Sequence, residues 1–247
     1  MNYHWNWSIF WDPSPEGSGT YLDLLLQGLL TTLETAAAAW VVALVLGCIM
    51  GVFRSLPGDT WLGRMAQATG TAYVELFRNI PLLVQLFLWY FVLPEVVPRP
   101  AGLWLKQLPN APFLIASIGI GLFMSARVAE QLRAGLGALP KGQRYAGMAL
   151  GLTTLQTYRY VLLPMAFRII LPPLTSELIN TIKNTSVALT IGLAELTAEA
   201  RAMQEFSFQV FEAFTAATIA YLAVNLVATL LMRALERRVR VPGYVGA

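Results

Sequence analysis

Charged side chains are scarce in this chain. Only 13% of its 247 residues are Asp, Glu, Lys or Arg, whereas 56% are hydrophobic. An average soluble domain is charged at about a quarter of its residues. The composition therefore excludes an ordinary soluble protein and predicts one that lies in a lipid bilayer.

Cysteine and histidine are almost absent. Cys48 is the only cysteine and His4 the only histidine, so we expect no disulfide framework and no cysteine cluster that holds a metal. A histidine-based metal site and a catalytic triad with a histidine base are not expected either. The sequence offers no catalytic residue, no metal site and no cofactor site.

A nucleotide-binding P-loop is also missing. The motif G-x-x-x-x-G-K-[ST] requires Ser or Thr directly after its lysine, but the three lysines are followed by Gln107, Gly142 and Asn184. We therefore expect that the chain does not hydrolyse ATP and is not an enzyme. An internal repeat with a period of about 20 to 50 residues is absent as well, which favours one membrane domain.

The first 23 residues contain no Lys or Arg but hold Trp5, Trp7 and Trp11. A secretory signal peptide begins with a positively charged region, so this segment does not resemble one. Tryptophan is enriched where a bilayer meets water. We expect residues 1–23 to form an extracytoplasmic segment that is anchored at the membrane interface.

Long uncharged runs are what the chain does have. They cover residues 35–53, 79–94, 107–126 and 213–232. About 20 helical residues cross the hydrocarbon core, and the shortest run can extend backward through residues 73–77. A further span over residues 169–193 is interrupted by Glu177 and Lys183. The sequence predicts an all-α membrane domain of five spans within residues 24–237.

Lys and Arg are unevenly distributed between the predicted spans. Positive charge is retained on the cytoplasmic side of a membrane. With the N-terminus outside, thirteen of the 17 Lys and Arg residues fall in inward segments, and outward segments hold only Arg99, Lys106 and Arg201. The loop 141–164 and the tail 238–247 are then cytoplasmic. Attraction to anionic lipid accounts for the net charge of +3, so no nucleic-acid partner is expected.

Residues 141–164, KGQRYAGMALGLTTLQTYRYVLLP, form a polar helix-turn-helix pattern in an otherwise apolar chain. Gly151 can take the left-handed conformation that ends a first helix. Thr153 and Gln156 fit a capping box that begins a second helix, and Pro164 is expected to end it. On these residues alone, the segment is either a plain connector between spans or a docking loop.

The spacing of Gly151, Leu162, Leu163 and Pro164 resembles the EAA loop by which permease subunits of ATP-binding-cassette importers engage their ATPase. Three further stretches are similar to the polar amino acid permease family: VELFRNIPLLVQLFLWYF at 74–91, SARVAEQLRAGLGALPKGQ at 125–143 and LPPLTSELINTIKNTSV at 171–187. The resemblance covers most of residues 24–237. It implies the type I importer permease fold with a cytoplasmic coupling helix-turn-helix.

The same resemblance implies which residues contact the ATPase. They are Tyr145, Ala146, Gly147, Gly151, Thr153, Leu162 and Pro164. Where the loop family usually opens with Glu-Ala-Ala, this chain has Tyr145, Ala146 and Gly147.

Polar residues at the start of the second predicted span are candidates for the transport pathway. A charged side chain at the bilayer centre costs about 2.5 to 3.5 kcal/mol on insertion scales, so it usually faces protein or water. Glu75 and Arg78 are three residues apart and can simply pair. The resemblance implies instead that Arg78 and Gln85, on either side of a bend at Pro81, line the pathway.

Arg127 ends an uncharged run, and Glu130 follows three residues later. Members of the resembled family often carry a tyrosine where this chain has Arg127. A guanidinium offers a fork of donors that suits a carboxylate, which favours an acidic amino acid as substrate. The alternative is that Arg127 only neutralises Glu130 or extends to the cytoplasmic interface.

A polar stripe marks the fourth predicted span. Glu177, Asn180, Thr181 and Asn184 recur at steps of three and four residues, which puts them on one helical face, with Lys183 and Ser186 beside it. Such a stripe lines a cavity or packs against another span. The pair Pro172 and Pro173 can free backbone carbonyls there. In the first span, the small residues of Gly47-x-x-x-Gly51 indicate close helix packing.

These observations predict a permease subunit of an ATP-driven bacterial amino acid importer in the inner membrane, with glutamate or aspartate as substrate. The resemblance implies two ATP-binding-cassette ATPase subunits that use ATP, an extracytoplasmic binding protein, and a second permease, for which a heterodimer is favoured. One alternative is an importer for another polar amino acid. Another is a secondary transporter or channel driven by an ion gradient, although such folds often have two related halves.

Overall fold

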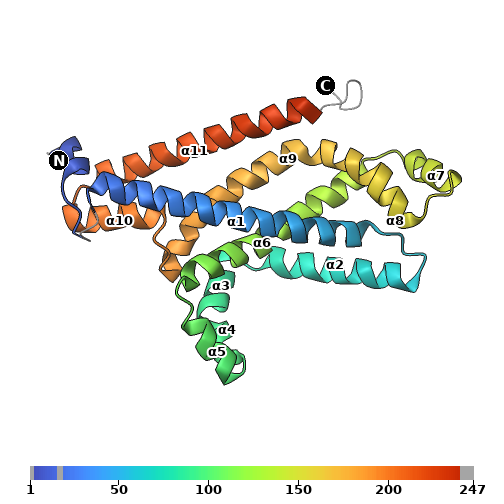
Figure 1. Cartoon of the computed structure of the whole chain (residues 1–247), viewed down its shortest axis with the longest axis horizontal. Helices are drawn as coiled ribbons and strands as arrows, with labels where there is room; N and C mark the ends of the chain where they lie inside the picture. The colour runs from blue at the N-terminus through green and yellow to red at the C-terminus, as the bar shows by residue number, and fades with distance from the viewer. Residues whose placement is uncertain (1–2, 16–18, 240–247) are drawn as a thin grey trace. The chain divides into compact units, whose positions relative to one another are not determined.

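A computed structural model describes residues 3–15 and 19–239 of the chain (Figure 1). Most of the predicted tail 238–247, including Arg240, lies outside the described residues. The helices are η1 (Trp7–Trp11), α1 (Tyr21–Ser55), α2 (Trp61–Asn79), α3 (Leu82–Phe87), α4 (Leu93–Val96), α5 (Arg99–Lys106), α6 (Ala111–Gly137), α7 (Lys141–Ala149), α8 (Thr154–Thr157), α9 (Leu163–Asn184), α10 (Leu196–Ser207) and α11 (Val210–Val239). Short π-helical turns η2 (Leu88–Val92) and η3 (Tyr158–Leu162) and the 3-10 helix η4 (Thr185–Ile191) join some of them.

Four stretches are long and apolar enough to cross a membrane. They are Tyr21–Ser55, Ala111–Gly137, Thr154–Ile191 and Val210–Val239. The pair Trp61–Asn79 and Leu82–Val96 makes a fifth if it is counted as one broken span. The described helices therefore agree with the predicted five spans, one of which is broken.

The break in the second span is sharp. The axes of Trp61–Asn79 and Leu82–Val96 differ by 100°. Pro81 has no backbone donor and disfavours a helical conformation at the residue before it. Ile80 accordingly adopts an extended conformation, with φ −99° and ψ 129°. The predicted bend at Pro81 is confirmed, and the span predicted over residues 73–94 is two helices.

Prolines in the span Thr154–Ile191 behave differently from the prediction. Pro164 does not end the helical segment, because α8 continues through the π turn η3 into α9. The extra residue of a π turn changes the backbone bonding just before Pro164, where a regular helix would conflict with the proline ring. Pro172 and Pro173 also lie inside α9, whose end at Asn184 leaves Ser186 on the 3-10 helix η4.

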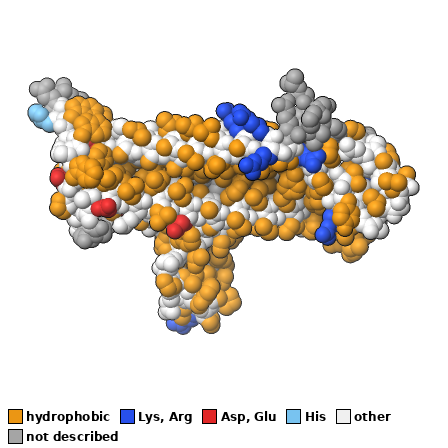
Figure 2. Space-filling view, turned by 45° about the horizontal axis from the view of Figure 1, so that its top comes forward, with side chains coloured by type: hydrophobic (Ala, Val, Ile, Leu, Met, Phe, Trp, Pro, Cys, Tyr) orange, Lys and Arg blue, Asp and Glu red, His pale blue; other side chains and the backbone are white. Residues whose placement is uncertain are grey.

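The surface of the described helices is largely apolar. Hydrophobic side chains dominate the visible face, and charged side chains are few (Figure 2). Of the most apolar 18-residue stretch of α11, only 6% is buried inside the protein. Large apolar surface of this kind is stable against lipid or a partner subunit and not against water.

The chain divides into two compact units. The first comprises residues 1–40, 81–121 and 180–227. Its core joins the start of α1 to α10 and α11 through side chains that include Leu24, Leu25, Leu196, Met203 and Ala217. The fully buried Glu212 of α11 holds the N-terminal segment, since it accepts hydrogen bonds from the Tyr3 hydroxyl and, at 2.7 Å, from the Asn6 backbone N–H.

A second buried carboxylate in this unit begins α10. Glu195 caps the helix by accepting from the Ala198 N–H at 2.9 Å, and it also accepts from the Tyr221 hydroxyl at 2.7 Å. Burial raises the pKa of the Glu195 carboxyl above its ordinary value. These bonds stabilise the join of α10 to α11.

The other unit comprises residues 41–80, 122–179 and 228–247. In it α1 and α6 approach closely at two glycines. A Cβ atom at Gly47 would lie 2.6 Å from the Val128 Cβ, and one at Gly51 would lie 2.9 Å from the Ala129 carbonyl oxygen. No larger residue fits at that distance, so the predicted packing role of Gly47 and Gly51 is confirmed.

Candidate functional site

Arg127 forms a two-bond ion pair with Glu177 in the second unit. The guanidinium lies on α6 and the carboxylate on α9. Arg127 donates from Nε to Oε2 at 2.6 Å and from Nη2 to Oε1 at 3.3 Å. Gln131, one helical turn after Arg127, donates to the same carboxylate at 3.4 Å. These bonds use one edge of the guanidinium and fix its orientation.

Burial differs between the two partners. The Glu177 side chain is only 5% exposed, whereas that of Arg127 is 44% exposed. Removing a carboxylate from water is unfavourable unless a cation and hydrogen-bond donors meet it, which explains why Glu177 needs Arg127. Arg127 is thus the more accessible partner of the pair.

Glu130 is the centre of a separate cluster that joins α1, α2 and α6. Its carboxylate contacts Arg54 of α1, accepts from Arg133 Nε at 3.1 Å, and lies 3.8 Å from Arg78 Nη1. Three guanidinium groups around one carboxylate leave an excess of positive charge. Glu130 thus serves mainly to hold three helices together through their arginines.

These pairings differ from the alternatives that the sequence left open. The structure pairs Arg127 with Glu177, so the alternative in which Arg127 neutralises Glu130 is wrong. Arg78 approaches Glu130, while Glu75 accepts a hydrogen bond from Asn79 at 2.9 Å. Spacing along one helix suggested the pairs Glu75–Arg78 and Arg127–Glu130, whereas Arg78 and Arg127 approach carboxylates on neighbouring helices.

Sequence reasoning missed Arg54, Arg133 and Gln131. Arg133 follows Glu130 by three residues, and that spacing was a usable signal for an ion pair. Arg54 is 76 positions away from Glu130. Only the approach of α1 to α6 at Gly47 and Gly51 brings these two side chains together.

The remaining pathway candidates occupy the first unit. Gln85 is buried on α3, and Asn180 and Asn184 are half-buried on α9. Lys183 is exposed, and Ser186 donates to the Lys183 carbonyl at 2.7 Å. Their role along a transport pathway stays a prediction.

The structure contains the helix-turn-helix predicted over residues 141–164, but its second helix continues beyond Pro164 into α9. Helix α7 ends at Ala149, and Gly151 has a φ of +77°, in the left-handed region. The Thr153 N–H donates to Gln156 Oε1 at 2.8 Å, and the Gln156 N–H donates to Thr153 Oγ1 at 3.3 Å. The predicted capping box is therefore confirmed.

Close packing holds the two helices of this segment together. A Cβ atom at Gly147 would lie 3.0 Å from the Thr157 Cγ2, so the first helix can approach the second because residue 147 is a glycine. Apolar side chains remain exposed on the segment, namely Tyr145, Met148, Leu150, Leu155 and Tyr160. Exposed apolar side chains that gather in this way occur where a protein meets a partner or a membrane.

A cavity of about 330 Å³ connects this segment to the Glu130 cluster. Arg54, Arg133 and Arg144 line it together with Tyr158, whose hydroxyl donates to the Ser55 carbonyl. Its walls also include Leu139 and Pro140, directly before α7. Residues of the 141–164 segment and of the Glu130 cluster thus line one cavity.

Among residues 3–15 and 19–239, no group of three or more His, Cys, Asp or Glu side chains is arranged to hold a metal ion. The described geometry therefore consists of membrane-spanning helices, polar side chains buried between them, and a segment with exposed apolar side chains between two spans. That combination defines the membrane subunit of a transporter.

The family is shown by comparison with known proteins. Residues 43–241 match the family described as binding-protein-dependent transport system inner membrane component, and the chain belongs to this family. It is 45% identical to the glutamate/aspartate import permease protein GltJ of Escherichia coli over 249 aligned residues, which cover 100% of this chain and 99% of the relative. Identity to the glutamine transport system permease protein GlnP of Escherichia coli is 34%, over 96% of this chain and 98% of the relative.

Solved structures agree with this assignment. A chain of an amino acid ABC transporter crystallised with histidines matches with a TM-score of 0.72 and 29% identity, over 88% of this chain and 95% of that one. An inward-facing MetNI methionine ABC transporter matches with a TM-score of 0.75 over 89% and 98%, but its 21% identity supports the fold alone.

The chain is accordingly a multi-pass inner-membrane protein and a permease subunit of an ABC amino acid importer with the type I fold. The predicted fold class, function class and localisation are confirmed. An ion-gradient-driven transporter or channel is not retained as an alternative.

Proposed function

We propose that this permease carries glutamate or aspartate into the cell, using ATP that separate ATPase subunits hydrolyse. The observation that supports this choice of substrate is the 45% identity, over the whole chain, to a permease named for glutamate and aspartate import. An extracytoplasmic binding protein delivers the amino acid to the outer face of the membrane subunits.

The geometry of Arg127 supports an acidic substrate. One edge of its guanidinium is held by Glu177, and the side chain is 44% exposed. A guanidinium fixed in this way presents its free donors in one orientation, which lowers the entropic cost of binding a carboxylate. We assign Arg127 as the residue that binds the side-chain carboxylate of the substrate.

The coupling segment supports an external ATPase. Residues 141–164 combine a glycine-dependent turn with exposed apolar side chains that suit a protein surface. We assign two ATPase subunits to a pair of such segments, one on this chain and one on a second, similar permease. A heterodimer of permeases is favoured over a homodimer.

The decisive experiment is uptake into vesicles that contain the purified complex, with binding protein outside and ATP inside. We expect ATP-dependent uptake of labelled glutamate and aspartate, with glutamine, histidine and arginine transported much more slowly. A non-hydrolysable ATP analogue is the control. Preferred uptake of a neutral or basic amino acid would contradict the proposed substrate, and uptake without hydrolysable ATP would contradict the proposed energy source.

A further inference from the structure

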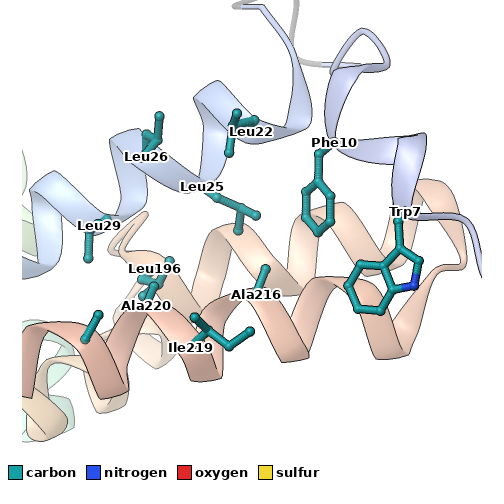
Figure 3. A pocket seen from close by; sticks show the side chains of 11 residues that line it. Trp7, Phe10, Leu22, Leu25, Leu26, Leu29, Leu196, Ala216, Ile219 and Ala220 are labelled. Carbon is teal, nitrogen blue, oxygen red and sulfur yellow. The ribbon is translucent and has the colours of Figure 1, made fainter.

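An apolar groove of about 350 Å³ lies in the first compact unit, where η1 meets α1 and α11 (Figure 3). All of its lining side chains are hydrophobic, and they include Trp7, Phe10, Leu25, Leu29, Ile219 and Ala220. Trp7 and Phe10 reach from the N-terminal segment toward α11, and Leu25 reaches in from α1 (Figure 3). The groove is thus shaped by the segment that Glu212 holds in position.

Water is a poor occupant of this groove. A buried water needs two to four polar partners, and these walls offer apolar side chains. An empty groove would also forfeit the dispersion contacts of its lining atoms. Both α1 and α11 are candidate membrane spans, so a lipid chain can reach the groove from the bilayer. A hydrocarbon chain is the occupant that matches its chemistry.

An aromatic platform adjoins the groove, and Trp7 belongs to both. The Trp5 and Trp7 rings are stacked, with centroids 5.7 Å apart and planes inclined by 7°. Phe211 lies 5.5 Å from Trp5 and 4.7 Å from Tyr3. Trp5 is 58% exposed and Trp7 51% exposed. Phe10 also stacks on Trp7, with ring centroids 6.3 Å apart, so the ring that the platform offers to a ligand is Trp5. An exposed tryptophan ring attracts ammonium groups through cation–π interactions.

Charge around the platform favours a cation over an anion. Residues 1–53 of the sequence contain no Lys or Arg, and Arg201 of the neighbouring α10 is paired with Glu205. Sites for anionic lipid headgroups are built from unpaired residues of this kind. Carboxylates are present, with Asp12 exposed beside η1. A negatively charged headgroup finds no lysine or arginine among residues 1–53, whereas an ammonium group can meet the exposed ring of Trp5.

We propose that this surface binds a zwitterionic phospholipid, with one acyl chain in the groove and its ammonium headgroup against the exposed ring of Trp5. The N-terminal segment closes over the chain and becomes part of the lipid site. With the predicted orientation, the lipid belongs to the outer leaflet. This site is independent of the transported substrate.

Brominated phospholipids test the proposal, since bromine quenches nearby tryptophan fluorescence. The importer complex is reconstituted with brominated phosphatidylethanolamine or brominated phosphatidylglycerol, and the Trp7 signal is the difference between wild type and Trp7→Phe. We expect ethanolamine lipid to quench Trp7 at about two- to fivefold lower mole fraction, the preference that one exposed cation–π contact gives.

Variants separate the two halves of the site. Ala220→Phe fills the groove and should abolish the quenching, while Ala37→Phe, at an exposed position of α1 outside the groove, should leave it unchanged. Trp5→Leu should remove the headgroup preference but keep quenching, and Trp5→Phe should keep both. Native mass spectrometry should find one fewer ethanolamine lipid per permease in Ala220→Phe only.

Three results would overturn the proposal. Equal quenching by the two lipids would remove the headgroup assignment, and unchanged quenching in Ala220→Phe would remove the groove. Absence of quenching in wild-type complex, together with disulfide crosslinking of Ile219→Cys to the second permease, would show that a protein helix covers the groove instead.

Discussion

At the scale of single residues, two carboxylates in the second compact unit have different tasks. Glu177 is almost completely buried and holds one guanidinium by two bonds. Glu130 is shared among arginines of three helices. Glu177 therefore orients Arg127, whereas Glu130 stabilises the packing of the helices. Variants of Glu177 and of Glu130 should therefore have different defects, the first in the orientation of Arg127 and the second in the packing of the helices.

Arg127→Tyr should depress glutamate and aspartate uptake severely. Losing one charge-assisted hydrogen bond costs about 1.5 to 3 kcal/mol, or roughly a tenfold to hundredfold loss in binding. Arg127→Lys should recover only part of it, because an ammonium keeps the charge but loses the planar fork. The measurement is vesicle uptake, normalised to permease that copurifies with the ATPase.

The control for this prediction follows from the observed pairing. If Arg127 only neutralises Glu177, then Arg127→Tyr combined with Glu177→Gln removes both charges and should restore transport. Near wild-type uptake by that double variant would leave Arg127 with a structural role alone. We expect the double variant to assemble normally and to remain defective for acidic substrates.

Glu130→Gln should lower stability more than it lowers substrate affinity. It leaves Arg54, Arg78 and Arg133 without their shared carboxylate, at a cost of about 1 to 3 kcal/mol, and each kcal/mol lowers the unfolding midpoint by about 2 to 4 °C in a domain of this length. Glu75→Gln is the matched control, since Glu75 is exposed. Equal midpoints for the two variants would contradict the role of Glu130.

At the scale of elements, the segment 141–164 depends on backbone geometry. Gly151 has a φ of +77°, a region that costs other residues about 1 to 2 kcal/mol. The exposed apolar side chains of α7 and α8 are presented to a partner only if this turn forms. The same segment continues through η3 and Pro164 into α9, so α8 belongs to the same helical stretch as a candidate membrane span.

Gly151→Asp should uncouple the permease from its ATPase. The substitution adds strain and charge at the turn, and we expect uptake to fall at least about tenfold, given both penalties. Gly142→Asp is the control, because it adds the same charge in the first turn of α7, where a Cβ meets open space and a helix tolerates acidic residues. The result that would remove Gly151 from this role is full uptake with unchanged ATPase copurification.

At the scale of the whole molecule, orientation in the membrane rests on the distribution of Lys and Arg. Thirteen of these 17 residues fall in segments predicted to face inward. The helices add a constraint, because an odd number of spans puts the two chain ends on opposite sides. Four spans and one broken pair satisfy that requirement.

Single cysteines at Gln143 and Ser207, each in a Cys48→Ala background, should label from opposite sides of the membrane. Gln143 lies on α7 and Ser207 ends α10. An impermeant thiol reagent applied to intact cells should modify position 207 only. Labelling of position 143 from outside would contradict the predicted orientation.

The sequence by itself determined the membrane class, the span count, the bend at Pro81 and the glycine turn at residue 151. These depend on local properties, namely hydrophobic length, missing backbone donors and left-handed φ angles. Only the tertiary structure decided that Arg127 pairs with Glu177 and that Arg54 reaches Glu130. Such pairs depend on how closely distant helices approach, and side-chain spacing along one helix carries no information about that distance.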